Sequence, residues 1–342
     1  MQQRGPAPVV RLAVATVVAG IGAVIVLLGI SAVLRAPGGL AGRGGDAVPT
    51  PAAAVTAAPP TPGASGPSPS ASPSPSGDPV LVGAGDIGRC DSTADEETAA
   101  LVERLPGIVF TLGDNAYEHG TADQYRDCFG PSWGRFKDRI AFPVPGNHDY
   151  ETKDAEGYRD YFGAAAVRDG ATWYSADVGT WHVVVLDSTC AGVSGGCGAD
   201  SPQVRWLAAD LAASKASCTL ALFHHPRFSS GFHGNDPSVA PLWDALYAGG
   251  ADLVVNGHEH SYERFGAQDP SGAADDASGI TELVAGTGGA DLRPFNDPVP
   301  NSKVRSSLAY GVLSLTLRPS GWGWAFTSVD GTFSDTGSGA CH

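Results

Sequence analysis

From residue 79 onward, short apolar runs alternate with stretches of helical periodicity. Residues 79–85 form the first apolar run, and Asp86 follows it directly. Residues 108–112 form the second run, and Asp114 follows after a single glycine. Apolar runs of this length between turn residues are typical of buried strands. The pattern therefore predicts two strands, each with a carboxylate at its carboxyl end.

The segment between these two strands has the pattern of a helix. Apolar residues recur on one face through residues 93–105, and Thr93 and Glu96 have the spacing of a capping box. Pro106 and Gly107 end the pattern. Strand, helix and strand in this order predict a βαβ unit whose two strands are parallel.

Three further apolar runs are also followed by a polar side chain. Open α/β sheets bind ligands beyond the carboxyl ends of their strands. We therefore expect these side chains to share one crevice with the two aspartates. The pairs of run and side chain are residues 141–144 with Asn147, residues 220–223 with His224, and residues 253–255 with His258.

The rest of the pattern completes a fold of two sheets. Helical periodicity covers residues 202–214 and 238–248, and residues 172–177 and 181–187 form a hairpin-like pair of strand runs. Residues 311–317 and 323–329 alternate as antiparallel strands do. Helices outside two packed sheets accommodate all of these elements. The fold class is therefore α/β, a sandwich with α/β/β/α layers over residues 79–342.

Residues 1–35 have the pattern of a membrane segment. Residues 12–34 carry no charge, and a helix of that length spans about 34 Å, enough to cross a bilayer core. Arg4 and Arg11 precede the run, which predicts a cytoplasmic N-terminus and places the rest of the chain outside. We expect an uncleaved, single-pass signal anchor, and the alternative is a cleaved signal peptide with a secreted product.

Composition separates residues 36–78 from the region that follows them. These residues are mainly Ala, Pro, Gly, Ser and Thr, which predicts a disordered tether. Residues 1–78 hold four of the 21 basic residues and two of the 36 acidic ones, so residues 79–342 hold 17 and 34, a net charge of −17. Such a domain repels polyanions, and we expect no nucleic-acid partner.

All six cysteines lie in the region placed outside the cytoplasm, which favours disulfides. Six cysteines allow fifteen pairings, and sequence alone does not choose among them. We predict three bonds, from the short separation of the middle pair and by elimination for the others. The pairs are Cys90 with Cys128, Cys190 with Cys197, and Cys218 with Cys341.

The side chains that follow the strands have the composition of a two-metal site. Phosphate esters resist attack because the nucleophile and the phosphoryl oxygens are both electron-rich, and two neighbouring cations remove that obstacle. Such a site needs a carboxylate between the ions, with carboxylate, amide oxygen and imidazole around them. Five segments supply this mixture: residues 85–88, 113–117, 146–149, 223–226 and 257–260.

In this order, the five segments resemble the purple acid phosphatases within the calcineurin-like metallophosphoesterases. The pattern of that family is GDxG, GDxxY, GNH followed by an acid, VxxH and GHxH. Four of the five motifs match fully. The remaining motif, VxxH, has Ala221 in place of valine, which we expect to change strand packing and not coordination. The resemblance spans most of residues 83–264 and implies the two-sheet fold of the metallophosphoesterase type.

The resemblance also implies a role for each residue. His148, held by Asp149, would contact the substrate and help the leaving group, and His233 would face the substrate from a glycine-rich loop. His225 is an alternative to His224, but the histidine of the family stands two residues before a proline, as His224 does. The implied metal ligands are Asp86, Tyr117 and His260 for one ion, Asn147, His224 and His258 for the other, and Asp114 for both.

Two positions favour this subfamily over its relatives. Many calcineurin-like phosphodiesterases and nucleases have histidine where this chain has Gly88, and they lack a tyrosine ligand equivalent to Tyr117. Because an anionic oxygen donor favours a hard trivalent ion, we expect Fe(III) beside Asp86 and Tyr117 and a divalent Fe, Zn or Mn at the second position.

The resemblance implies an extracytoplasmic phosphatase that hydrolyses small phosphate monoesters by attack of a metal-bound hydroxide. One alternative is a phosphodiesterase or nuclease on the same metals, and Gly88, Tyr117 and the acidic surface argue against it. Another alternative is a non-catalytic surface module that binds phosphate. Such a module would be expected to lack some of the metal ligands, whereas this chain has suitable residues at all seven ligand positions.

Overall fold

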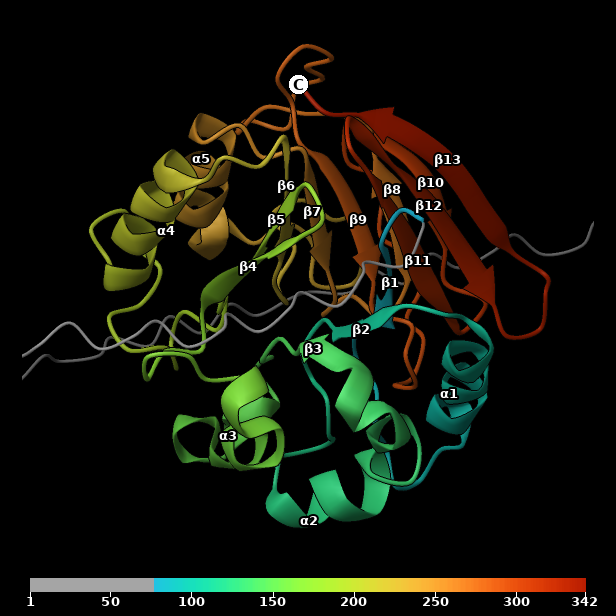
Figure 1. The fold of residues 1–342 in the computed structure, drawn as a ribbon. Coiled ribbons are helices and arrows are strands. Elements are labelled where there is room, and N and C mark those ends of the chain that lie inside the picture. The colour runs from blue at the N-terminus through green and yellow to red at the C-terminus, as the bar shows by residue number, and fades with distance from the viewer. Residues whose placement is uncertain (1–76) are drawn as a thin grey trace, which may run out of the picture. The chain divides into compact units, whose positions relative to one another are not determined.

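The computed structural model describes residues 77–342, which form two sheets with helices on their outer sides (Figure 1). The predicted signal anchor lies outside these residues, as does the predicted tether except for its last two positions. Among residues 77–342, no helix is long and apolar enough to cross a membrane. The division of the chain into residues 1–35, 36–78 and 79–342 stays a prediction.

The first sheet has six strands in the order β13-β12-β11-β1-β2-β3. Its strands β1 and β2 are parallel and the helix α1 connects them, which confirms the predicted βαβ unit. The predicted antiparallel pair is confirmed in β11 and β12. The strands are β1 Val80–Ala84, β2 Ile108–Thr111, β3 Ile140–Phe142, β11 Gly311–Arg318, β12 Gly321–Ser328 and β13 Ser334–Ala340.

The second sheet has seven strands in the order β10-β8-β9-β7-β6-β5-β4. The predicted hairpin is confirmed as the antiparallel pair β4 and β5, whereas β5, β6, β7 and β9 run parallel. The strands are β4 Tyr174–Val178, β5 Trp181–Val185, β6 Cys218–Leu222, β7 Leu253–Asn256, β8 Tyr262–Phe265, β9 Thr281–Ala285 and β10 Ser302–Ser306.

The predicted helices are present with small shifts at their ends, but the capping box is wrong. The hydroxyl of Thr93 makes no capping hydrogen bond, and the backbone N–H of Ala94 donates instead to Oγ of Ser92 at 3.2 Å. Ser92, one residue before Thr93, therefore supplies this hydrogen bond in place of the expected cap. The α-helices are α1 Ala94–Arg104, α2 Ala122–Gln124, α3 Glu156–Phe162, α4 Pro202–Ala213 and α5 Ala240–Ala248. Shorter helical turns are η1 Tyr125–Phe129, η2 Trp133–Arg139, η3 Asp149–Glu151, η4 Lys153–Ala155, η5 Gly163–Ala165 and η6 Pro237–Val239.

Three apolar clusters hold the layers together. The largest lies between the two sheets and includes Leu81, Phe110 and Leu220, all with no exposed surface. A second cluster packs α4 and α5 on the seven-stranded sheet, and a third packs α1 and α3 on the six-stranded sheet. Each sheet is therefore covered on both faces, which gives the predicted α/β/β/α order of layers.

The strand β13 was not predicted, because its residues lack the apolar alternation of a half-buried strand. It pairs with β12, where Trp324 lies opposite Gly337 and Trp322 opposite Gly339. The two tryptophan rings lie over these glycines, so that any larger side chain at either glycine would collide with a ring. Tryptophans on the neighbouring strand thus supply the apolar surface that β13 lacks.

All three predicted disulfide bonds are present. They join Cys90 to Cys128, Cys190 to Cys197 and Cys218 to Cys341, and residues 77–342 contain no free cysteine. The third bond ties the start of β6 to the chain end beyond β13, across 123 positions of sequence. It therefore links the two sheets covalently.

Candidate metal centre

The candidate ligands lie just beyond the strand ends that the sequence predicts. Asp86, Asp114 and His258 each follow a strand and each adopt a positive φ, of 61°, 49° and 68° respectively. A non-glycine residue in this conformation costs free energy, on the order of 1 kcal/mol, and such residues gather at functional sites. The sharp turn directs each side chain into the space beyond the sheets.

The phenol of Tyr117 lies at the centre of one group of ligands. Its Oη is 2.9 Å from Oδ1 of Asp86, 3.3 Å from Oδ2 of Asp114 and 3.1 Å from Nε2 of His260. All four side chains are almost fully buried. Two carboxylates, a phenol and an imidazole therefore converge within hydrogen-bond distance of one another.

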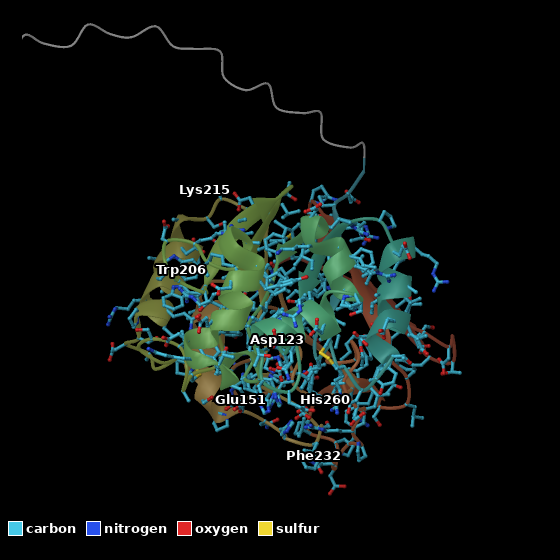
Figure 2. All side chains as sticks on the ribbon, turned by 90° about the horizontal axis from the view of Figure 1, so that it is seen from below. Asp123, Glu151, Trp206, Lys215, Phe232 and His260 are labelled. Atoms are coloured by element: carbon cyan, nitrogen blue, oxygen red, sulfur yellow. A yellow bond between two sulfur atoms is a disulfide. The ribbon has the colours of Figure 1, made fainter. Side chains whose placement is uncertain are left out.

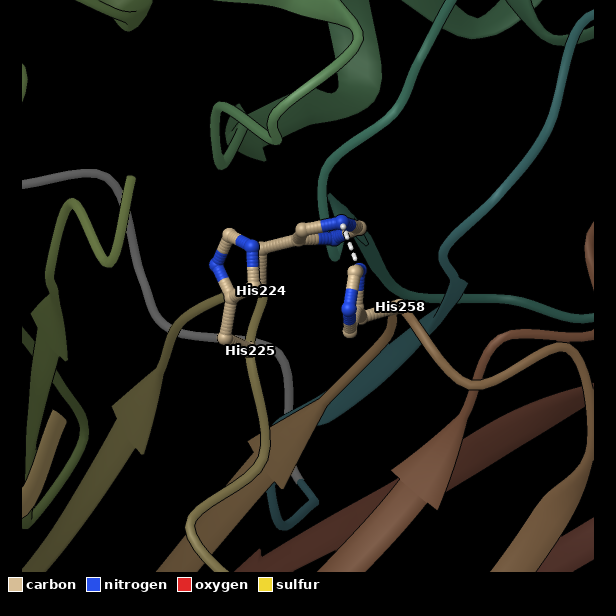
Figure 3. A group of neighbouring side chains, drawn as sticks. All are labelled: His224, His225 and His258. Atoms are coloured by element: carbon tan, nitrogen blue, oxygen red, sulfur yellow. Dashed lines mark hydrogen bonds between the residues drawn. The ribbon is translucent and has the colours of Figure 1, made fainter. Parts of the chain in front are cut away.

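The imidazole of His224 lies at the centre of the other group. Its Nε2 is 3.2 Å from Oδ2 of Asp114, from Oδ1 of Asn147 and from Nδ1 of His258. Figure 3 marks the contact between His224 and His258 with a dashed line. Because Asp114 belongs to both groups, the structure brings all seven predicted ligands together.

Hydrogen bonds from outside the cluster fix the ligand orientations. Nδ1 of His224 contacts the carbonyl oxygen of Leu112 at 2.6 Å, and Nδ1 of His260 contacts that of Asp291 at 2.7 Å. Each contact leaves Nε2 facing the cluster, the arrangement usual for metal-binding histidines. Gly113, with φ of 86°, lies against the His224 ring and leaves no room for a side chain.

The charges of the cluster fit bound cations. Asp86 and Asp114 are buried, and within residues 77–342 only histidines approach them as ion-pair partners. Burial raises the pKa of Asp114, but the neighbouring His224, His148 and His258 outweigh it and lower that pKa overall. Buried carboxylates without lysine or arginine need positive charge from another source, and this set of oxygen and imidazole donors can bind it.

His225 has a different environment from His224. Its Nδ1 lies 2.9 Å from Oγ of Ser188, and the same hydroxyl accepts a hydrogen bond from the backbone N–H of His225 at 2.9 Å. Burial and the charge of His224 lower the pKa of His225 to about 3. One ring nitrogen of His225 still lies within 4.8 Å of ligand atoms of His224 and His258. Asp114 and Asn147, however, contact His224.

His148 lies beside the cluster, but its predicted contact with Asp149 is wrong. Nδ1 of His148 contacts the carbonyl oxygen of Glu118 at 2.5 Å, and Nε2 lies 4.0 Å from Oδ2 of Asp114. The buried carboxylate of Asp149 instead accepts hydrogen bonds from backbone and side-chain groups around the Asp114 turn. These donors are the hydroxyl of Tyr125 at 2.6 Å, Nδ2 of Asn115 at 3.0 Å and the N–H of Gly146 at 2.9 Å. Asp149 therefore supports the loops that carry the ligands.

His233 lies next to the cluster, as the resemblance implied. Its ring stacks on that of His258, with centroids 4.3 Å apart and planes inclined by 26°. Sequence reasoning missed two residues that hold it. The buried carboxylate of Glu259 accepts a hydrogen bond from the backbone N–H of His233 at 2.9 Å, and Nη1 of Arg293 lies 3.0 Å from Nε2 of His233. The position of Glu259 between the predicted ligands His258 and His260 is a signal in the sequence that could have identified it. Arg293 lies in no motif that could have identified it.

The fold and the cluster define the class of protein. The calcineurin-like phosphoesterase family matches residues 80–262, which hold all of the candidate ligands. The chain therefore belongs to the calcineurin-like phosphoesterase family. Within it, the chain is similar to the purple acid phosphatases, as its GDxxY motif implied.

Two curated relatives illustrate this similarity. Purple acid phosphatase 15 of Arabidopsis thaliana is 28% identical over 53% of this chain and 40% of its own length. A phosphoenolpyruvate phosphatase of Allium cepa is also 28% identical, with the same two coverages of 53% and 40%. The chain thus spans less than half of the length of these relatives.

A solved structure supports the fold. Purple acid phosphatase PPD1 from yellow lupin superposes with a TM-score of 0.63 over 78% of this chain and 54% of its own. The sequence identity of that pair is 18%, so the comparison bears on the fold alone.

Proposed function

We propose that residues 79–342 form a binuclear metal-dependent phosphatase that hydrolyses phosphate monoesters. The observation that carries this proposal is the position of Tyr117, whose Oη lies within 3.3 Å of Asp86, Asp114 and His260. Burial and both carboxylates raise the pKa of Tyr117 well above its usual value, so the phenolate form of this side chain requires a neighbouring cation. The same arrangement is a complete ligand set for a hard cation.

Two cations fit the cluster because Asp114 contacts both of its halves. When bound, they would lower the pKa of water and offset the charge of the phosphoryl oxygens. The residues that would hold them are Asp86, Tyr117 and His260 on one side, Asn147, His224 and His258 on the other, and Asp114 between them. His258 N–H also donates to Oδ2 of Asp86 at 2.8 Å, which fixes the two halves relative to one another.

His148 is the proposed donor to the leaving group. Its Nδ1 is engaged by the carbonyl of Glu118, so its Nε2 is the nitrogen that faces the cluster. In the reaction, a water oxygen forms a bond to phosphorus, the bond to the ester oxygen breaks, and the ester oxygen takes a proton. The products are an alcohol and inorganic phosphate. We assign the last proton transfer to His148, and we place His233 in the wall of the substrate site.

The competing interpretation is a phosphodiesterase or nuclease, and a pair of substrates separates the two. We expect the kcat/KM for 4-nitrophenyl phosphate to exceed that for bis(4-nitrophenyl) phosphate by at least about 100-fold. A ratio of this size corresponds to the loss of one charged contact to the phosphoryl group. Release of nitrophenol gives both rates. A preference for the diester would refute the monoesterase assignment while leaving the metal cluster intact.

We propose Fe(III) beside Asp86 and Tyr117 and a divalent Fe, Zn or Mn at the other position. Iron-loaded protein should then show a visible charge-transfer band from the tyrosinate, and the Tyr117→Phe variant should lose that band. Tyr262→Phe is a matched control, because Tyr262 is also buried but donates to Asp335, away from the cluster. An iron-loaded protein that lacks the band, or a band that survives in Tyr117→Phe, would exclude Tyr117 as the ligand.

We also propose that the catalytic domain acts outside the cytoplasm, tethered by residues 36–78 to a membrane anchor or released by cleavage. The three disulfide bonds support an oxidising location, because such bonds are rare in the cytosol. The proposed partners are small phosphate esters and, through residues 1–35, a membrane.

A further inference from the structure

Arg293 lies beside the metal cluster without a carboxylate partner. Its backbone N–H donates to the carbonyl of His260 at 3.0 Å, and its guanidinium reaches Nε2 of His233 at 3.0 Å. Within residues 77–342, no carboxylate comes within 4 Å of this guanidinium, whereas Arg89 and Arg264 both form ion pairs. In a domain of net charge −17, an arginine left unpaired at the site is available to a ligand.

Each ring nitrogen of His233 lies near a protein group. A guanidinium can only donate, so Nε2 of His233 accepts from Arg293 and the ring proton lies on Nδ1. That Nδ1 is 3.5 Å from Oε2 of the buried Glu259. Both nitrogens of His233 are thus directed at protein groups, and His233 acts as a positioning residue that holds Arg293.

The loop beneath Arg293 is held rigidly by buried glutamates. Glu259 accepts from the N–H groups of His233 and Gly234, both at 2.9 Å. Glu263 accepts from the N–H of Ser230 at 2.8 Å, and Glu282 from that of Arg227 at 3.0 Å. Because three carboxylates fix this loop, the guanidinium has a defined position before any ligand binds.

An exposed aromatic ring lies beside Arg293. Phe232 is 59% exposed and lies at the surface of the molecule, with the Arg293 guanidinium 5.6 Å from its ring centroid (Figure 2). The cations of the cluster would hold the scissile phosphate, so a group that reaches Arg293 belongs to the leaving side of the ester. An anion there would meet a cation with no competing carboxylate.

We propose that Arg293 is a specificity-determining residue, which selects phosphate esters whose leaving group carries a second anionic group, a carboxylate or another phosphate. This inference rests on the proposed phosphatase function. It assigns the choice among monoesters to one guanidinium that Glu259 and His233 hold in place.

Binding of two phosphonates to the metal-loaded full chain tests the proposal without turnover. The probes are 3-phosphonopropionate and propylphosphonate, which differ by a carboxylate in place of a methyl group. We expect calorimetry to show a preference of about tenfold in Kd for the carboxylate, the usual strength of a charge-assisted hydrogen bond. Arg293→Gln should reduce the preference to about one, and Arg293→Lys should retain part of it.

Arg205→Gln is the matched control, because Arg205 is exposed on α4 and the charge change is identical. Equal Kd values for the two probes in the unmodified protein, or the same preference in Arg293→Gln as in Arg205→Gln, would overturn the proposal. Since each preference is a ratio within one protein sample, an inactive fraction does not affect it. Failure of the phosphatase function itself would appear differently, as absent hydrolysis of 4-nitrophenyl phosphate beside an intact binding preference.

Discussion

Asp114→Ala is expected to lose almost all phosphate-ester hydrolysis, with kcat reduced by more than about 10³-fold, because loss of one transition-state donor alone costs about 10²–10³. The Asp114 carboxylate contacts side chains of both halves of the cluster, at 3.3 Å from Oη of Tyr117 and 3.2 Å from Nε2 of His224. Its removal should also lower the amount of bound metal, measured by elemental analysis of the purified variant.

Two further variants separate loss of the ligand from loss of the fold. Alanine is disfavoured at the positive φ of Asp114, whereas asparagine tolerates it, so Asp114→Asn removes the charge without backbone strain. Asp244→Ala changes an exposed aspartate on α5 and should keep normal activity. Hydrolysis by Asp114→Asn within about tenfold of the unmodified protein would show that the carboxylate does not bridge two ions.

Most of the site could be predicted because its ligands follow the strands that position them. Asp86 and Asn147 are each weak signals alone, but each follows an apolar run, and parallel strands deliver their carboxyl ends to one edge of a sheet. The family pattern then assigned the order of the ligands. The structure agrees with this assignment, because Nε2 of His224 contacts Asp114, Asn147 and His258.

The support around the ligands could not be predicted in the same way. The resemblance implied that Asp149 holds His148, yet the Asp149 carboxylate accepts a hydrogen bond from Tyr125, 24 positions away in the sequence. Arg293 belongs to a loop after β9 and reaches His233 across 60 positions of sequence. Such contacts depend on tertiary packing between irregular segments, for which periodicity and spacing carry no information.

Only the bond between Cys190 and Cys197 had a basis in the sequence, which was its short separation. The four other cysteines still allow three pairings, and the fold explains which of them occurs. Cys218 begins β6 next to Trp181, and the chain returns through β13 to bring Cys341 to that same end of the molecule. His342 N–H donates to Asp252 at 3.0 Å and holds the terminus there.

Removing the bond between Cys218 and Cys341 is therefore expected to cost far more stability than removing the bond between Cys190 and Cys197. The two bonds close segments separated by 123 and 7 positions. In the chain-entropy model these lengths correspond to about 4.9 and about 2.4 kcal/mol of unfolding free energy. Urea unfolding of the Cys218→Ala, Cys341→Ala double variant and of the Cys190→Ala, Cys197→Ala double variant measures both losses.

The short-loop variant is the control for the alanine substitutions, since each double variant removes two half-cystines. Cys218 and Cys197 are both almost fully buried, so the loss of packing at those positions is similar. Equal losses in the two variants would mean that the long bond does not stabilise the protein by restricting its unfolded chain. A larger loss at 218 and 341, with β13 the first region to exchange its amide hydrogens, would show that this bond holds the glycine-rich edge strand in place.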